Sequence, residues 1–126
     1  MIIDSDVLID FLKDDKRTVA KIKEIEEVEE LKTTSINTFE ILKGFFALNK
    51  KEENIINFIN NLMILDFDFQ SSEKAAEIFD ELRKRGEIID TLDLFIASIA
   101  IVNNETLITR NSKHFQRIPE LKITEF

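Results

Sequence analysis

Apolar residues recur along this chain at two different spacings. Short runs of aliphatic and β-branched residues predict buried strands, and longer runs with an apolar residue every three or four positions predict amphipathic helices. The predicted strands span residues 1–4, 33–36, 63–67, 106–109 and 122–124. The predicted helices span residues 7–12, 16–31, 37–48, 51–61, 72–85 and 90–102. Strands and helical segments therefore alternate along the whole chain.

This alternation indicates a largely parallel sheet that is covered by helices on both faces. The predicted fold class is α/β, in the form of a three-layer α/β/α sandwich. The segment 90–102 is apolar on nearly every side, which predicts a buried helix. Ala97 and Ala100 in this segment allow its neighbours to pack closely.

Polar residues and a glycine mark several predicted helix ends. Asn37, followed three residues later by Glu40, matches a capping box and predicts a helix start. Asp90 or Thr91 is expected to cap the buried helix, and Gly86 lies just past the expected end of another helix. Helix capping is therefore one explanation for polar residues at these positions.

The composition fits one globular domain. The 126 residues, of which 44% are hydrophobic, supply enough apolar side chains for a single core, so residues 1–126 are interpreted as one domain. The absence of cysteine excludes a disulfide scaffold, a thiolate zinc site and a cysteine nucleophile.

Nothing in the sequence predicts contact with a membrane. The first residues lack a basic stretch followed by a cleavage site of small residues, so no secretory signal is expected. The longest nearly apolar run, 94–102, has about half the length that a bilayer crossing needs. We expect a soluble protein, with the reducing cytoplasm as the default location.

The net charge of −8 restricts how a polyanion could bind. An acidic chain argues against nucleic-acid binding through a globally basic surface, since phosphate contacts need clustered Lys and Arg. A local excess of positive charge occurs near the end of the chain, at Arg110, Lys113, Arg117 and Lys122. A polyanion is expected to approach there, or through a metal ion.

Several polar residues lie where predicted strands end or helices begin. Asp4 ends the first strand, Glu40 lies four residues beyond the second, and Asn111 follows the strand 106–109 by two residues. Asp93 lies at the start of the buried helix. Because the exits of parallel strands share one edge of a sheet, Asp4, Glu40 and Asp93 can come together. Three clustered carboxylates repel one another unless a cation lies among them, and oxygen ligands suit Mg²⁺ or Mn²⁺ rather than zinc.

Four segments of the chain together resemble a known family. They read IIDSDVLIDF at the start, NTFEILKG after the second strand, DLFIASIA in the buried helix and LITRNSKHF near the end. In this order and spacing they resemble PIN-domain ribonucleases of the VapC toxin type, over essentially the whole chain. The resemblance implies a Mg²⁺-dependent endoribonuclease, with Mn²⁺ as a substitute ion, that acts as the toxin of a VapBC-type toxin-antitoxin pair.

The resemblance also implies the site residues. Asp4, Glu40 and Asp93 match the three metal-binding acids of the family and are the expected catalytic and metal-binding residues. Ser5 matches the hydroxyl residue beside the first acid. Asn111 matches the fourth position, where many PIN domains have Asp and many toxins of this type have Asn, and it is expected to be catalytic without being a metal ligand.

Asp6 and Asp90 are expected to lie outside the metal-binding set, as helix caps or as supports of the site. The expected reaction is attack of metal-activated water on an RNA phosphodiester, which leaves 5′-phosphate and 3′-hydroxyl ends. His114, the only histidine, is interpreted as an ordinary exposed ring.

The expected partners are an RNA substrate, a second copy of the chain and a VapB-like antitoxin. The family implies an antitoxin that offers a basic residue to the site, where an Arg guanidinium can pair with carboxylates and displace a cation. Apolar residues around Leu8, Phe11, Leu12 and Phe45 are the expected anchors for the antitoxin, with core packing as the alternative explanation.

Two other functions are open at this point. An Asp-x-Asp after an apolar strand also occurs in haloacid-dehalogenase-like phosphatases, although Val7 and Leu8 stand here where Thr or Gly is expected. A PIN-like fold can also serve as a binding or scaffold module that needs no metal ion.

Overall fold

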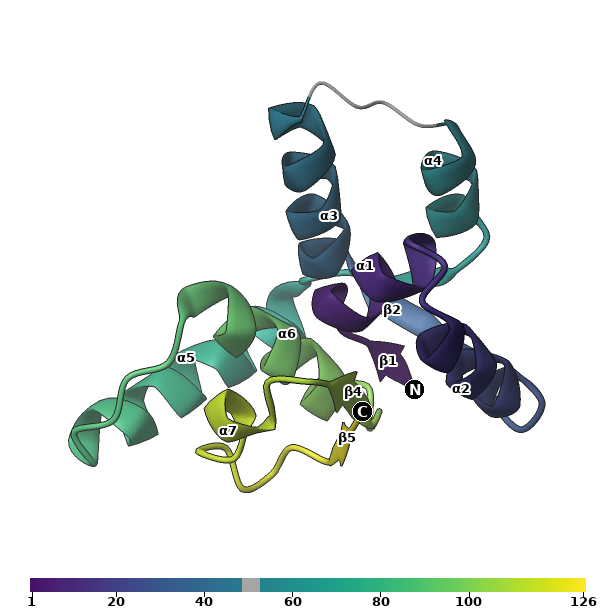
Figure 1. The fold of residues 1–126 in the computed structure, drawn as a ribbon. Coiled ribbons are helices and arrows are strands. Elements are labelled where there is room, and N and C mark those ends of the chain that lie inside the picture. Colours follow the sequence, from purple (N-terminus) through teal and green to yellow (C-terminus); the bar gives the residue numbers. More distant parts are fainter. Residues whose placement is uncertain (49–52) are drawn as a thin grey trace.

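The computed structural model describes residues 1–48 and 53–126, and the strands in this part form one parallel sheet. The strands are β1 (Ile2–Ile3), β2 (Lys32–Thr34), β3 (Met63–Leu65), β4 (Leu107–Thr109) and β5 (Ile123–Glu125). Their order is β3-β2-β1-β4-β5, and each neighbouring pair is parallel. The central strand β1 therefore lies between β2 and β4 (Figure 1).

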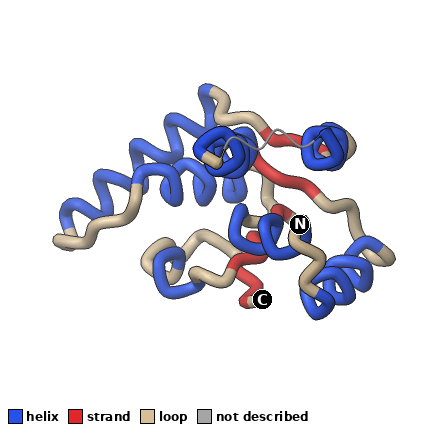
Figure 2. Tube along the Cα trace, turned by 45° about the horizontal axis from the view of Figure 1, so that its top comes forward, coloured by secondary structure: helices blue, strands red, loops and turns tan. Residues whose placement is uncertain are grey.

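The helices make up the layers on either side of the sheet. They are α1 (Ser5–Leu12), α2 (Lys16–Glu26), α3 (Ser35–Ala47), α4 (Glu53–Asn60), α5 (Phe69–Lys84), α6 (Thr91–Val102) and α7 (Ser112–Phe115). Figure 2 shows the strands in the middle of the molecule with helices around them. None of the helices in the described residues is long and apolar enough to cross a membrane.

The side chains of the central strands separate two hydrophobic cores. Ile2 and Leu107 point into one core, whereas the next residues, Ile3 and Ile108, point into the other. Successive residues of a strand face opposite sides of a sheet, so both faces are covered. This arrangement confirms the predicted α/β/α sandwich.

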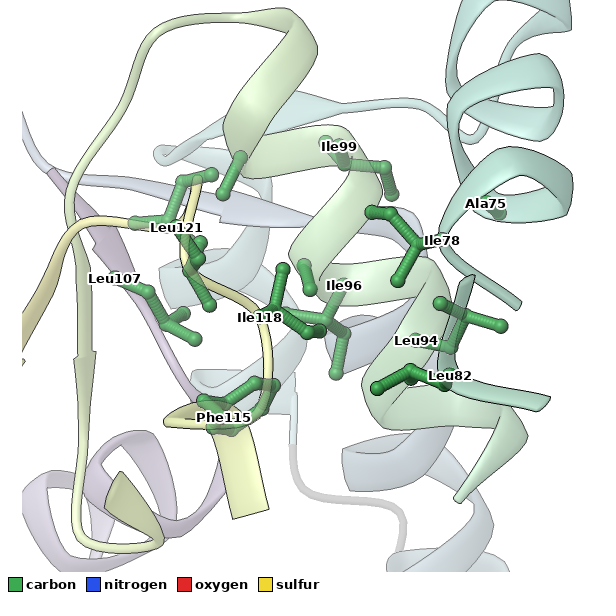
Figure 3. Close-up of a cluster of buried hydrophobic side chains, with 13 residues drawn as sticks. Ala75, Ile78, Leu82, Leu94, Ile96, Ile99, Leu107, Phe115, Ile118 and Leu121 are labelled. Carbon is green, nitrogen blue, oxygen red and sulfur yellow. The ribbon is translucent and has the colours of Figure 1, made fainter. Parts of the chain in front are cut away.

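The first core lies between the sheet, α5, α6 and α7 (Figure 3). The predicted burial of the helix over 90–102 is confirmed, because Ile96, Ala97, Ile99 and Ala100 of α6 have no exposed surface. The second core gathers apolar side chains of α1 to α4 against Ile3.

The strand order identifies one edge of the sheet as the place for a site. From β1 the chain moves outward to β2 and β3, and it then returns to the other side of β1 for β4 and β5. In such sheets a crevice forms outside the carboxyl ends of the two strands where the order reverses. Here those ends are Asp4, after β1, and Arg110, after β4.

One predicted helix end and one predicted helix cap are wrong. The helix predicted over 16–31 ends at Glu26, and the acidic run that follows would have lain at a helix C-terminus, where the helix dipole disfavours negative charge. The helix predicted to begin at Asn37 begins at Ser35, because Thr34 is its N-cap and accepts a hydrogen bond from the Asn37 N–H at 3.1 Å. The predicted capping box of Asn37 and Glu40 is therefore not formed.

The remaining elements agree with the prediction to within three residues. Helix α5 begins earlier than the predicted residue 72, because Asp68 caps it by accepting from the Ser71 N–H. It ends at Lys84, and Gly86 follows with a φ of 70°, as expected for a glycine just past a helix end. Residues 51 and 52 of the helix predicted over 51–61 lie outside the described residues.

Candidate active site

Asp4 lies at the carboxyl end of β1, where the chain leaves the sheet and enters α1. The residue is 5% exposed, and its carboxylate accepts hydrogen bonds from three segments. The donors are the Ser5 N–H at 2.9 Å, the Asn37 amide at 2.9 Å and the Thr109 hydroxyl at 2.7 Å. The starts of α1 and α3 and the end of β4 therefore meet at one buried carboxylate.

Glu40 lies on α3, almost one turn beyond Asn37, and reaches the same region. The Ser5 hydroxyl donates a hydrogen bond to Glu40 Oε1 at 2.8 Å. The same hydroxyl accepts a hydrogen bond from the Asn37 amide at 2.8 Å. The side chains of Ser5 and Asn37 thus connect Glu40 to Asp4.

Asp93 lies in the first turn of α6. This helix packs in the first core, on the other face of the sheet from α1 and α3. Asp90 is the N-cap of α6 and accepts from the Leu92 N–H at 3.0 Å, which matches its expected capping role. Asp93 Oδ2 lies 3.4 Å from Nδ1 of His114 on α7. His114 is exposed, as expected, but its ring contacts a candidate metal ligand.

Burial and like charge raise the pKa of each acid in this group. Burial is the largest cause for Asp4, whose pKa is also raised by repulsion from Asp93 and Glu40. Burial likewise raises the pKa of Glu40, with a further contribution from Asp93. Burial and then repulsion from Asp90 raise the pKa of Asp93, and His114 opposes this shift. The structure therefore places the three predicted acids within electrostatic range of one another.

Asp6 and Asn111 lie beside this group. Burial, followed by repulsion from Asp4, raises the pKa of Asp6, whose carboxylate accepts from the Arg110 N–H at 3.1 Å. The backbone N–H of Asn111 donates to the Thr109 hydroxyl at 3.0 Å, while its side chain makes no capping hydrogen bond with α7. The structure connects Asn111 to the site through its backbone, and a catalytic role of its side chain stays a prediction.

The donor set is of the kind that a hard cation prefers. Asp4, Glu40 and Asp93 offer only carboxylate oxygens, which suit Mg²⁺ or Mn²⁺. In the described residues, no group of three His, Cys, Asp or Glu side chains is already arranged around a common point for an ion. Glu40 and Asp93 are partly exposed, whereas Asp4 is buried.

Sequence reasoning misses two side chains that hold Asp4. Asn37 matches a helix-cap pattern and Thr109 matches a buried strand position, so neither spacing indicates a site. A signal for Asn37 exists in Thr34, a suitable N-cap three residues earlier, which leaves the Asn37 side chain free to point elsewhere. A signal for Thr109 is its position at the end of the strand that precedes Asn111.

The basic residues near the end of the chain do not form one cluster. Arg110 lies 3.0 Å from the Asp10 carboxylate and so reaches toward α1. Arg117 donates to the backbone carbonyl of Ile88, which lies between α5 and α6. Arg110 and Arg117 are therefore held by different parts of the fold, and Lys113 lies on α7.

Comparison with known proteins identifies the family of this chain. The sequence pattern of the PIN domain matches residues 1–121. The chain belongs to the PIN-domain family. This PIN domain is 32% identical to ribonuclease VapC1 of Methanocaldococcus jannaschii over 121 residues, which are 95% of this chain and 82% of the relative. It is 41% identical to ribonuclease VapC2 of Rickettsia felis over 91 residues, which are 70% of this chain and 68% of the relative.

The fold of this PIN domain is similar to a solved structure of VapBC2 from Rickettsia felis bound to a DNA fragment from its promoter. The TM-score is 0.87 and the identity 28%, over 99% of this chain and 97% of the other. The resemblance to VapC PIN domains is therefore confirmed by sequence and by structure. Membership of this family removes the haloacid-dehalogenase-like phosphatase from the alternatives.

Replacing Asp93 by Asn should stabilise the metal-free PIN domain at neutral pH. Folding raises the pKa of Asp93, so the folded state binds the proton more tightly, and stability falls as the pH rises from the unfolded pKa through the folded pKa. Asp93→Asn removes this loss, which we expect to be on the order of 1 kcal/mol, or roughly 3–6 °C in Tm. Below about pH 3 Asp93 is neutral in both the folded and the unfolded state, so the difference should disappear.

The measurement is the Tm of the unmodified protein and of Asp93→Asn, in EDTA, at pH values from about 3 to about 7. Asp80→Asn on α5 is the control, because Lys84 and Arg83 lower the pKa of Asp80 and its removal should give no gain. An Asp93→Asn variant that is no more stable than the unmodified protein at pH 7 would contradict the electrostatic account.

Proposed function

We propose that this PIN domain is a Mg²⁺-dependent endoribonuclease, with Mn²⁺ as a substitute ion, and the toxin of a VapBC-type pair. The observation that carries the proposal is the buried Asp4, linked through Ser5 to Glu40 and within electrostatic range of Asp93. The relatives named as VapC ribonucleases support the reaction class, and the similar VapBC structure supports the toxin role.

Asp4, Glu40 and Asp93 are the residues that would hold the ion. When bound, the ion would supply the activated water that attacks the phosphodiester and neutralise charge on the leaving oxygen. Thr109 donates to Asp4 and thereby favours the ionised form that a cation needs. The exposed Asn111 is the proposed fourth catalytic residue.

Replacing Asp4 by Asn should abolish RNA cleavage while the protein stays folded. Loss of one ligand removes several kcal/mol of transition-state stabilisation, which corresponds to about a hundredfold or more in rate. The fold should tolerate the change, because the Thr109 hydroxyl can accept from the new amide in place of donating to the carboxylate. Cleavage of total RNA and far-UV circular dichroism, measured on the same samples, test both parts, with Asp80→Asn as the control.

The ends of the products test the chemistry independently. Metal-activated water should leave 5′-phosphate and 3′-hydroxyl ends, and EDTA should stop cleavage. Sequencing of RNA ends after controlled expression, with an Asp4→Ala control, reads out both the ends and the target. Cyclic phosphate ends or EDTA-resistant cleavage would contradict the mechanism, and absence of Mg²⁺ binding in calorimetry would favour the scaffold alternative.

An apolar groove leads to Glu40 and is the proposed site for the antitoxin. It lies between α1, α3 and α4, at the top of Figure 1, and has a volume of about 380 Å³. Its lining residues are Ile9, Leu12, Lys13, Glu40, Ile41, Gly44, Phe45, Leu48 and Ile55.

Of the expected anchors for the antitoxin, Leu12 and Phe45 line this groove. Leu8 is fully buried in the core, and the partly buried Phe11 packs on the ring of Phe58 in α4, so neither is among the residues that line the groove.

A bulky side chain at Gly44 should block the antitoxin. A Cβ added at this position meets no atom within 4 Å, so a larger residue fits on α3 and extends into the groove. Gly44→Phe should weaken binding of the VapB-like protein encoded beside this chain by at least about tenfold, or 1.4 kcal/mol. Gly44→Ala is the control and should bind like the unmodified protein. Equal affinity of both variants in calorimetry would exclude this groove.

We also propose that the protein forms a homodimer. Large apolar side chains are exposed in the described part of the surface, including Phe39, Phe46, Phe69 and Phe79. Burying such side chains against a second copy would remove them from water. Light scattering at micromolar concentration should give twice the mass of the chain, and a monomer under these conditions would refute the dimer.

A further inference from the structure

Asn37 is a fully buried carboxamide in the first turn of α3 whose hydrogen bonds all point inward. Its Nδ2 donates to Asp4 Oδ1 at 2.9 Å and to Ser5 Oγ at 2.8 Å. Its Oδ1 accepts from the Thr34 hydroxyl at 2.7 Å. Both amide hydrogens and one lone pair of Asn37 are therefore used in contacts with three side chains.

The surrounding groups determine which way this amide points. A reversed amide would place its oxygen against the Asp4 carboxylate, where two acceptors would face each other. The Thr34 hydroxyl accepts from the Asn37 N–H and can donate its own proton only to an acceptor, which is Asn37 Oδ1. The hydrogen-bond network thus permits a single orientation of the amide.

This orientation controls the proton of Ser5. The Ser5 hydroxyl accepts from Asn37, so its one proton is directed to Glu40 Oε1 at 2.8 Å. One carboxamide therefore acts on two of the acids, directly on Asp4 and through Ser5 on Glu40.

The same contacts select one oxygen of Asp4. A carboxylate oxygen has two lone pairs, and Oδ1 accepts from both the Ser5 N–H and Asn37. Oδ2 accepts only from Thr109 in the described part of the chain, so it retains one lone pair. A cation would consequently meet Asp4 through Oδ2.

We propose that Asn37 is a positioning residue of the cation site, which occupies Oδ1 of Asp4, leaves Oδ2 for the ion and directs the Ser5 hydroxyl to Glu40. This inference rests on the proposed metal-dependent function. Residues that orient metal ligands typically contribute about 10–100-fold to metal affinity. Asn37 differs from an ordinary buried polar residue in that its loss should change metal binding and not stability alone.

The test is titration of Mn²⁺ into the full chain by calorimetry, without RNA. Asn37→Leu, which has a similar size and no donors, should weaken Mn²⁺ binding by at least tenfold. Asn37→Ala leaves space for water that can donate in place of the amide, so it should show a smaller loss, and it decides the question if Asn37→Leu does not fold.

Thr33→Val is the matched control for the loss of a buried hydrogen bond. Thr33 is fully buried on β2, and its hydroxyl donates to the backbone carbonyl of Ile3 at 3.2 Å and not to the side chain of any of the acids. This variant should lower the Tm while its Mn²⁺ affinity stays within twofold of the unmodified protein. If Asn37 has a purely structural role, Asn37→Leu and Asn37→Ala should behave like Thr33→Val, with a lower Tm and a Mn²⁺ affinity within twofold of the unmodified protein.

The outcomes separate this inference from the proposed function. If the unmodified protein binds Mn²⁺ and both Asn37 variants bind within twofold of it, the positioning role is wrong and the metal site stands. If the unmodified protein binds no Mn²⁺, the metal site is wrong and the inference falls with it. Weaker binding by the Asn37 variants, with unchanged binding by Thr33→Val, supports the positioning role.

Discussion

The arrangement of the candidate site depends on the burial of one carboxylate, that of Asp4. A buried charge is unfavourable unless hydrogen bonds replace the water that it loses. Asp4 obtains these bonds from α1, α3 and β4, so the same contacts that make its burial tolerable also fix where these elements meet. The strand order brings the carboxyl ends of β1 and β4 together, and the hydrogen bond from Asn37 to Asp4 joins the start of α3 to them.

The site carries an electrostatic conflict that the rest of the fold must offset. Burial raises the pKa of Asp4, Glu40 and Asp93, and Asp93 raises the pKa of the other two further. A cation placed among them would reverse the effect of each repulsion. The repulsion among these acids opposes folding of the free protein, and a positive charge bound among them would relieve it. This reasoning applies equally to a metal ion and to a basic side chain of a partner.

Much of the fold and the acids of the site could be predicted because their signals are local. Asp4 directly follows an apolar strand, and Asp93 lies in the first turn of a helix that is apolar on nearly all sides, so period and position make them candidates and the family resemblance then selects them. The role of Asn37 could not be read in this way, because Asn followed by Glu at the fourth position is also a capping pattern. Its contacts with Ser5 and Asp4 join residues more than 30 positions apart, and such pairing depends on how α3 packs against α1.

Helix α3 carries residues of both the candidate site and the apolar groove on one of its faces. Asn37, Glu40 and Gly44 follow one another at intervals of three and four residues, which places them along one stripe of a helix. Asn37 contacts Asp4, and Gly44 lines only the groove. Glu40, between them, lies in the candidate site and also lines the groove. A partner segment lying in this groove would reach Glu40 without entering the core, since the groove is open and lined mainly by side chains of α1, α3 and α4. Because Glu40 is shared, any group that pairs with it from the groove competes with a cation for the same carboxylate. Under the proposed function, occupation of the groove and metal binding would be coupled through the side chain of Glu40, which lines the groove and also accepts from Ser5.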